Sequence, residues 1–140
     1  MKGIIIYSSQ YGSTKQYAQW LGEDLKLETV SYKDIKVKEL EKYDFLILGS
    51  SIAAYKLTLS AWIIKNWEKL NTKKLFLFTV SGANPNDKKI GDFLDNSFSK
   101  DIQNKMEIFS LHGRMIFKKL PFMIQIVMKM VKNTQKDPET

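Results

Sequence analysis

Short apolar runs alternate along the chain with longer segments in which apolar residues recur at every third or fourth position. The short runs are rich in branched and aromatic residues, which is typical of buried strands. They fall within Lys2–Tyr7, Leu27–Tyr32, Asp44–Ser50, Lys74–Val80 and Glu107–Leu111. The periodic segments predict amphipathic helices. These segments are Ser13–Leu27, Leu59–Leu70, Ile90–Ile102 and Met115–Lys132.

Strands that are apolar throughout and alternate with helices indicate a parallel sheet covered on both faces. The predicted fold class is therefore α/β, a doubly wound five-stranded parallel sheet with helices on both faces. A chain of 140 residues fits one domain. We expect this domain to span residues 1–132 and a flexible C-terminal tail to follow at residues 133–140.

Three predicted loops leave the carboxyl ends of strands, which is where such sheets bind their ligands. They are Ser8–Thr14, Ser50–Lys56 and Ser81–Asp87, and each begins with small polar residues. Because the carboxyl ends of parallel strands share one edge of the sheet, we expect the three loops to form one ligand site.

The first loop, with the sequence SSQYGST, is rich in hydroxyl groups and precedes a helix. It matches neither the GxxxxGK[ST] pattern of nucleotide hydrolases nor the GxGxxG pattern of dinucleotide sites. Hydroxyls and backbone N–H groups at the positive end of a helix can bind a phosphate without a cation. The alternative is a simple turn and helix cap, since hydroxyl residues favour helix starts.

Composition narrows the possible chemistry. The chain has no cysteine, which excludes disulfides, thiolate metal sites and cysteine nucleophiles. Its one histidine, His112, excludes a histidine-rich metal site, and no residue stands out as a catalytic acid or base. We therefore predict no metal site and no catalytic side chain. Without a visible signal peptide or an apolar run of about 18 residues, we expect a cytoplasmic protein.

The charge is basic, with 22 basic and 15 acidic residues and a formal net charge of +7. This balance favours acidic partners or anionic surfaces. The lysines are spread along the chain and form no zinc-finger or basic-zipper pattern, so we expect no specific nucleic-acid binding.

The first loop resembles the phosphate loop of flavodoxins, which usually reads [ST]-x-[TY]-G-x-T. Carried over to this chain, the resemblance implies a flavodoxin-like fold and FMN as the cofactor. It implies a phosphate site of Ser9, Gln10, Tyr11, Gly12, Ser13 and Thr14, with Gln10 contributing its backbone. The flavin ring would then lie between the second and third loops. The residues implied around the ring are Ser50, Ser51, Ile52, Ala53, Ala54, Tyr55, Ser81, Gly82, Ala83 and Asn84.

Specific roles follow from the same resemblance. Tyr55 is the aromatic candidate to stack on the ring, although it is equally compatible with a plain surface position. Ala53 and Ala54 leave room for a backbone rearrangement beside the ring, but such rearrangements usually favour glycine. Acidic flavodoxins disfavour the reduced flavin anion, whereas Lys56 and its basic neighbours would stabilise it. Stabilisation by about 1 kcal/mol raises a one-electron potential by roughly 40 mV, so we expect a less reducing flavin.

Two later segments are similar to menaquinone-dependent protoporphyrinogen dehydrogenases, which share the flavodoxin fold. These segments are Gly49–Leu70 and Leu111–Met130. The chain departs from those enzymes because it lacks their long basic segment after the fourth strand. We therefore favour an electron carrier with a redox-partner protein over a flavin-dependent oxidoreductase. A flavin-free interaction module is the third alternative.

The segment Met115–Lys132 leaves several partners open. It combines four methionines and other apolar residues with several lysines. Such a helix can pack in the core, form a homodimer face, or lie on an anionic membrane with access to quinone. The last alternative would place the protein at the inner face of the membrane.

Overall fold

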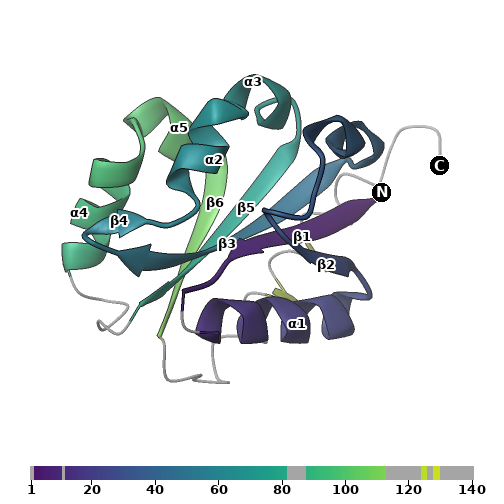
Figure 1. Cartoon of the computed structure of the whole chain (residues 1–140), viewed down its shortest axis with the longest axis horizontal. Helices are drawn as coiled ribbons and strands as arrows, with labels where there is room; N and C mark the ends of the chain where they lie inside the picture. Colours follow the sequence, from purple (N-terminus) through teal and green to yellow (C-terminus); the bar gives the residue numbers. More distant parts are fainter. Residues whose placement is uncertain (1, 11, 82–87, 113–123, 126–127, 130–140) are drawn as a thin grey trace.

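The computed structural model describes residues 2–10, 12–81, 88–112, 124–125 and 128–129. Figure 1 shows one twisted sheet with helices on both faces. Five strands run parallel in the order β2-β1-β3-β5-β6. Their bounds are β1 Gly3–Ser8, β2 Glu28–Ser31, β3 Phe45–Ala53, β5 Lys74–Ser81 and β6 Met106–His112. A short additional strand, β4 (Lys56–Leu57), pairs antiparallel with the end of β3. The predicted five-stranded parallel sheet is therefore confirmed.

The described helices divide between the two faces of the sheet. Helix α1 lies on one face, and α2 to α5 lie on the other (Figure 1). Their bounds are α1 Ser13–Leu25, α2 Ser60–Lys65, α3 Trp67–Leu70, α4 Lys88–Ser97 and α5 Lys100–Asn104, with a short 3₁₀ helix, η1, at Val37–Lys42. Because the sheet is covered on both sides, its central strands are apolar along nearly their whole length.

Each face of the sheet contributes to a separate apolar core. Ile4 and Ile6 belong to the core beneath α2 and α4, whereas Ile5 packs with Tyr17 and Leu21 of α1. This alternation is the two-residue period of a strand that is buried on both sides. Ile124 also packs against the core on the α1 side.

At the carboxyl end of the sheet, polar residues replace the apolar residues of the strands. Ser8, Ser50, Thr79 and Ser110 occupy matching positions on four adjacent strands. One position earlier, Gly49 makes room for the ring of Phe78, which a Cβ on Gly49 would overlap. The apolar core therefore gives way to a row of hydroxyl residues at the edge where the predicted loops begin.

Two helices predicted as continuous are interrupted. Leu59–Leu70 breaks at Asn66, whose side chain and backbone N–H both bond to the carbonyl of Trp62. Ile90–Ile102 breaks after Ser97, and Ser99 caps α5 by accepting a hydrogen bond from the Ile102 N–H. Apolar periodicity continues across both breaks, so it could not reveal them.

The predicted Ser50–Lys56 loop is also wrong, because β3 continues to Ala53 and turns directly into β4. The first predicted helix ends at Leu25 instead of Leu27, with Lys26 left-handed at its end. Of the predicted helix Met115–Lys132, the structure describes only residues 124–125 and 128–129, which are helical; the rest lies outside the described residues. None of the described helices combines the length and apolar character needed to cross a membrane.

Candidate functional site

The loop after β1 presents a buried hydroxyl group that has no partner. Thr14 lies in the first turn of α1 and is 1% exposed, yet its Oγ1 makes no hydrogen bond to any residue that the structure describes. A buried polar group without a partner costs stability, and such groups are rare in folded proteins. The hydroxyl therefore lacks a partner that a ligand bound at the start of α1 would supply.

Gly12 opens the space in front of this helix. It has a φ of +93°, in the region that favours glycine, and a Cβ placed on it would meet nothing within 4 Å. Its N–H donates a 3.0 Å hydrogen bond to the Ser9 Oγ, which closes the loop. Glycine thus permits both the turn and an open approach to the first turn of α1.

The start of α1 lacks the cap that the alternative interpretation requires. The N-cap residue is Gly12, and it provides no side-chain hydrogen bond to the helix. Ser13 and Thr14 lie inside the first turn. The positive end of α1 therefore faces the loop without a side-chain cap, an arrangement that favours an anion.

The second predicted loop is a tight hairpin. Ala53 pairs with Lys56, so Ala54 and Tyr55 alone connect β3 to β4. Both are left-handed, with φ values of +52° and +66°, which is the pattern of a type I′ turn. Tyr55 is 72% exposed at the tip. The turn therefore presents an aromatic ring to solvent at the sheet edge.

Hydroxyl groups form hydrogen bonds across the base of this hairpin. The fully buried Ser50 accepts a hydrogen bond from the Leu59 N–H at 3.0 Å and donates to the Ser51 carbonyl at 2.9 Å. The Ser51 and Thr58 hydroxyls lie 2.9 Å apart. In this structure the Ser50 hydroxyl stabilises the hairpin rather than facing an open site.

Helix α4 contacts the hairpin from the side. The Asn96 side chain donates to the Tyr55 carbonyl at 3.3 Å, and the Ser97 Oγ accepts from the Leu57 N–H at 2.9 Å. The rings of Tyr55 and Phe93 lie 6.0 Å apart. Sequence reasoning missed these α4 residues, because no local pattern shows which helix packs on which turn.

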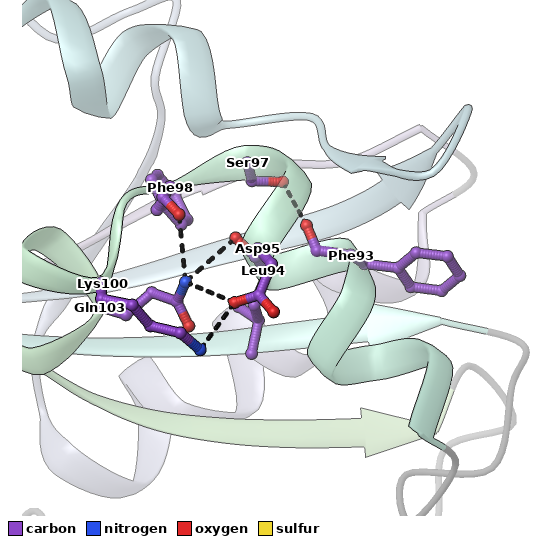
Figure 2. A network of polar contacts seen from close by, with 7 residues as sticks. All are labelled: Phe93, Leu94, Asp95, Ser97, Phe98, Lys100 and Gln103. Carbon is purple, nitrogen blue, oxygen red and sulfur yellow. Dashed lines mark hydrogen bonds and ion pairs between the residues drawn. The ribbon is translucent and has the colours of Figure 1, made fainter.

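A polar network fixes the junction between α4 and α5 (Figure 2). Asp95 forms a 2.8 Å ion pair with Lys100 and accepts a 3.0 Å hydrogen bond from Gln103. The Lys100 contact and then the Gln103 hydrogen bond lower the pKa of the Asp95 carboxyl below its ordinary value. Gln103 also donates to the Leu94 and Phe98 carbonyls. The network thus holds the end of the helix that contacts the hairpin.

The remaining predicted site residues divide between described and undescribed positions. Gln10 is exposed beside Ser9, and Ile52 and Ala53 form the last part of β3. Ser81 ends β5 and is in register with His112 of β6. Tyr11, Gly82, Ala83 and Asn84 lie outside the described residues. The loop after β1, the β3–β4 hairpin and Ser81 therefore all lie at the carboxyl edge of the sheet.

A second unpartnered hydroxyl was also missed by sequence reasoning. Thr79 of β5 is 1% exposed, and its Oγ1 has no hydrogen-bond partner in the described part of the chain. It lies in the hydroxyl row between Ser50 and Ser110. Strand alternation could have found this row once the strand register was known.

Solved structures of flavodoxins share this fold. A flavodoxin from the domain Archaea has 19% sequence identity and a TM-score of 0.65, with 96% of this chain and 99% of that chain covered. Oxidised flavodoxin 1 from Bacillus cereus has 17% identity and a TM-score of 0.66, covering 94% and 98%. Two-electron reduced Megasphaera elsdenii flavodoxin has 19% identity and a TM-score of 0.63, covering 81% and 88%. At these identities the likeness shows the fold alone.

The sequence itself establishes the family. A comparison with curated proteins found no match. A family model described as a flavodoxin domain, however, matches residues 4–140. The sheet order, the helices on both faces and the loop after β1 agree with that match. The chain therefore belongs to the flavodoxin-domain family.

Proposed function

We propose that this protein binds FMN and transfers electrons. The observation that carries the proposal is the Thr14 hydroxyl, which is buried at the start of α1 without a partner. The terminal phosphate of FMN supplies the acceptor that this hydroxyl lacks, and phosphate suits the positive end of a helix. A Cβ built on Gly12, the residue before α1, would meet no atom within 4 Å. The residues present therefore fit the phosphate group.

The other predicted residues complete the assignment. Ser9, Gln10, Tyr11 and Ser13 would join Gly12 and Thr14 in holding the phosphate, and the β3–β4 hairpin and residues 81–84 would hold the ring. Tyr55 is exposed at the hairpin tip, where it is accessible for stacking. The flavin supplies the redox chemistry, and the protein binds it and tunes its potential.

An electron carrier is favoured over an enzyme. The segment between β5 and α4 runs only from residue 82 to residue 87, whereas the similar protoporphyrinogen dehydrogenases carry a long basic segment at this point. The proposed physiological partner is a redox protein in the cytoplasm. The basic net charge favours an acidic partner surface.

Comparing FMN with riboflavin, which has no phosphate, tests the proposal. We expect FMN to stay with the purified protein through a desalting column. Thr14→Val removes the hydroxyl with little change in shape and should weaken FMN binding about tenfold, since hydrogen bonds to charged groups are the strong ones. Riboflavin binding should not change. Fluorescence titration of both flavins measures the two affinities.

Thr72→Val is the control, because Thr72 is exposed and precedes β5, at the opposite end of that strand from the proposed site. It should leave the affinity for both flavins unchanged. Failure of the wild-type protein to bind micromolar FMN would refute the proposed function. An equal loss of FMN and riboflavin affinity in Thr14→Val would refute the phosphate assignment.

The oxidoreductase alternative rests on the apolar and basic segment Met115–Lys132. A helix with these residues could reach quinone at an anionic membrane. Ile124 favours core packing instead, because it contacts the core on the α1 side. Sedimentation with anionic liposomes at low salt distinguishes membrane binding of this segment from core packing. Co-sedimentation that salt abolishes would favour the membrane enzyme, and its absence would favour the carrier.

A further inference from the structure

The turn between β3 and β4 has a conformation that its own residues do not favour. Ala54 and Tyr55 are both left-handed, although neither is glycine. A Cβ is disfavoured in this region, and two-residue turns of this kind favour Asn-Gly or Gly-Gly. Contacts from outside the turn must therefore hold it in place.

Those contacts come from one face of α4. Phe93, Asn96 and Ser97 follow the three- and four-residue spacing that places side chains on the same side of a helix. Phe93 packs near the Tyr55 ring, Asn96 bonds to the Tyr55 carbonyl, and Ser97 bonds to the Leu57 N–H. The helix thus contacts both the turn and the strand that follows it.

This face of α4 is itself held at its end. The Ser97 hydroxyl donates a 2.7 Å hydrogen bond to the Phe93 carbonyl while it accepts from Leu57. Figure 2 shows the Asp95, Lys100 and Gln103 contacts that join α4 to α5 directly beside these residues. The turn is therefore attached to a fixed support.

We propose that Asn96 and Ser97 are positioning residues that hold the Ala54–Tyr55 turn in the shape that receives the flavin ring. The inference rests on the proposed function, since it assigns the hairpin to the ring. Both residues act through the turn: Asn96 fixes the Tyr55 carbonyl, and Ser97 fixes Leu57, the last residue of β4.

Asn96→Ala tests the inference without disturbing the core, because Asn96 is exposed. In the flavin-free protein, we expect the Leu57 amide to exchange its hydrogen about fivefold faster. We expect FMN and riboflavin affinities to fall together by about fivefold, the fold-change of one lost hydrogen bond. Because riboflavin has no phosphate, an equal loss of both affinities would show that Asn96 affects binding of the ring and not of the phosphate. Asn104→Ala is the matched control, an exposed asparagine for which the described structure shows no side-chain hydrogen bond.

Ala54→Gly provides a rescue in the Asn96→Ala background. Glycine adopts positive φ readily, so it should restore the turn and recover most of the flavin affinity. If Asn96 contributed only to the stability of α4, Ala54→Gly would not recover the flavin affinity. Recovery therefore supports positioning, and an unrecovered affinity contradicts it.

The outcomes separate this inference from the proposed function. Wild-type protein that binds FMN while Asn96→Ala binds both flavins equally well would overturn the inference alone. Faster exchange at Leu57 with unchanged flavin affinity would also overturn it, because the hairpin would be held for stability only. Wild-type protein that binds neither flavin would overturn the proposed function and the inference together.

Discussion

The loop after β1 and the hairpin after β3 lie at the same edge of the sheet but are built in opposite ways. The loop has glycine where positive φ is needed and leaves the buried Thr14 hydroxyl without a partner. The hairpin has alanine and tyrosine at its positive φ positions, and hydroxyls and α4 bind its polar groups. The loop lacks a contact that a ligand can supply, whereas the hairpin is shaped by the protein itself.

The largest effect is expected from removing the hydrogen bond by which α4 supports the hairpin. Ser97→Ala leaves the buried Leu57 N–H without an acceptor and removes the bond to the Phe93 carbonyl. An unpaired buried donor costs about 1–3 kcal/mol. Urea unfolding of the flavin-free protein should show this loss. A change below about 0.5 kcal/mol would mean that water replaces the hydroxyl and the hairpin does not depend on Ser97.

The next largest effect is expected from removing the glycine of the loop. Gly12→Ala adds a Cβ that meets no atom but occupies a position with positive φ, so it should destabilise the protein by about 1 kcal/mol. Gly91→Ala is the matched control, because its Cβ also meets no atom but lies in helix α4. That change should stabilise by about 0.5–1 kcal/mol. If urea unfolding shows that both variants change the free energy of unfolding in the same direction, the backbone argument is contradicted.

The contrast also explains what the sequence could predict. The loop from Ser9 to Thr14 is contiguous, and a strand and a helix with clear periodicity flank it, so its place and composition were visible. The sheet was predictable because the central strands are buried on both faces and read as apolar runs. The row of hydroxyls required the strand register, which no local pattern provides.

The hairpin was not predictable for two physical reasons. Ala54-Tyr55 lacks the glycine or asparagine that normally signals such a turn, so the sequence pattern predicts a loop there. Its support comes from Asn96 and Ser97, which are 41 and 40 residues away from their hairpin partners. A contact over that separation exists only after α4 has packed on the sheet.

A third effect, of similar size, would sharpen the distinction between a ligand site and a structural hydroxyl. Thr14→Val should stabilise the flavin-free protein by about 1 kcal/mol, because it removes a buried polar group without a partner. The same variant should bind FMN more weakly. Urea unfolding with and without saturating FMN measures both. A destabilised flavin-free variant would show that the hydroxyl already has a partner, such as a buried water.

A fourth effect concerns the charge beside the hairpin tip. Lys56 is exposed in β4, next to Tyr55. Lys56→Gln should lower the one-electron potential for forming the reduced flavin anion by about 20 mV, which corresponds to roughly 0.5 kcal/mol for a screened surface charge. Lys69→Gln on α3 is the control on another exposed lysine. Spectroelectrochemistry at low and high salt measures the shift, and equal shifts in both variants would exclude a local effect of Lys56.

The smallest effect should come from the ion pair that supports α4. Lys100 and Gln103 lower the pKa of Asp95 in the folded protein, so the carboxylate contributes stability above its unfolded pKa and loses that contribution as pH falls through the folded pKa. Wild-type protein should therefore be slightly more stable than Asp95→Asn near pH 7. The difference should shrink below about pH 4, the usual range of aspartate. Urea unfolding at several pH values measures it. Hydrogen exchange at the Leu57 amide then shows whether the hairpin depends on Asp95. If acid speeds this exchange equally in wild type and Asp95→Asn, the support of the hairpin does not depend on Asp95. Asn96 and Ser97 would then hold the hairpin without help from the α4–α5 junction.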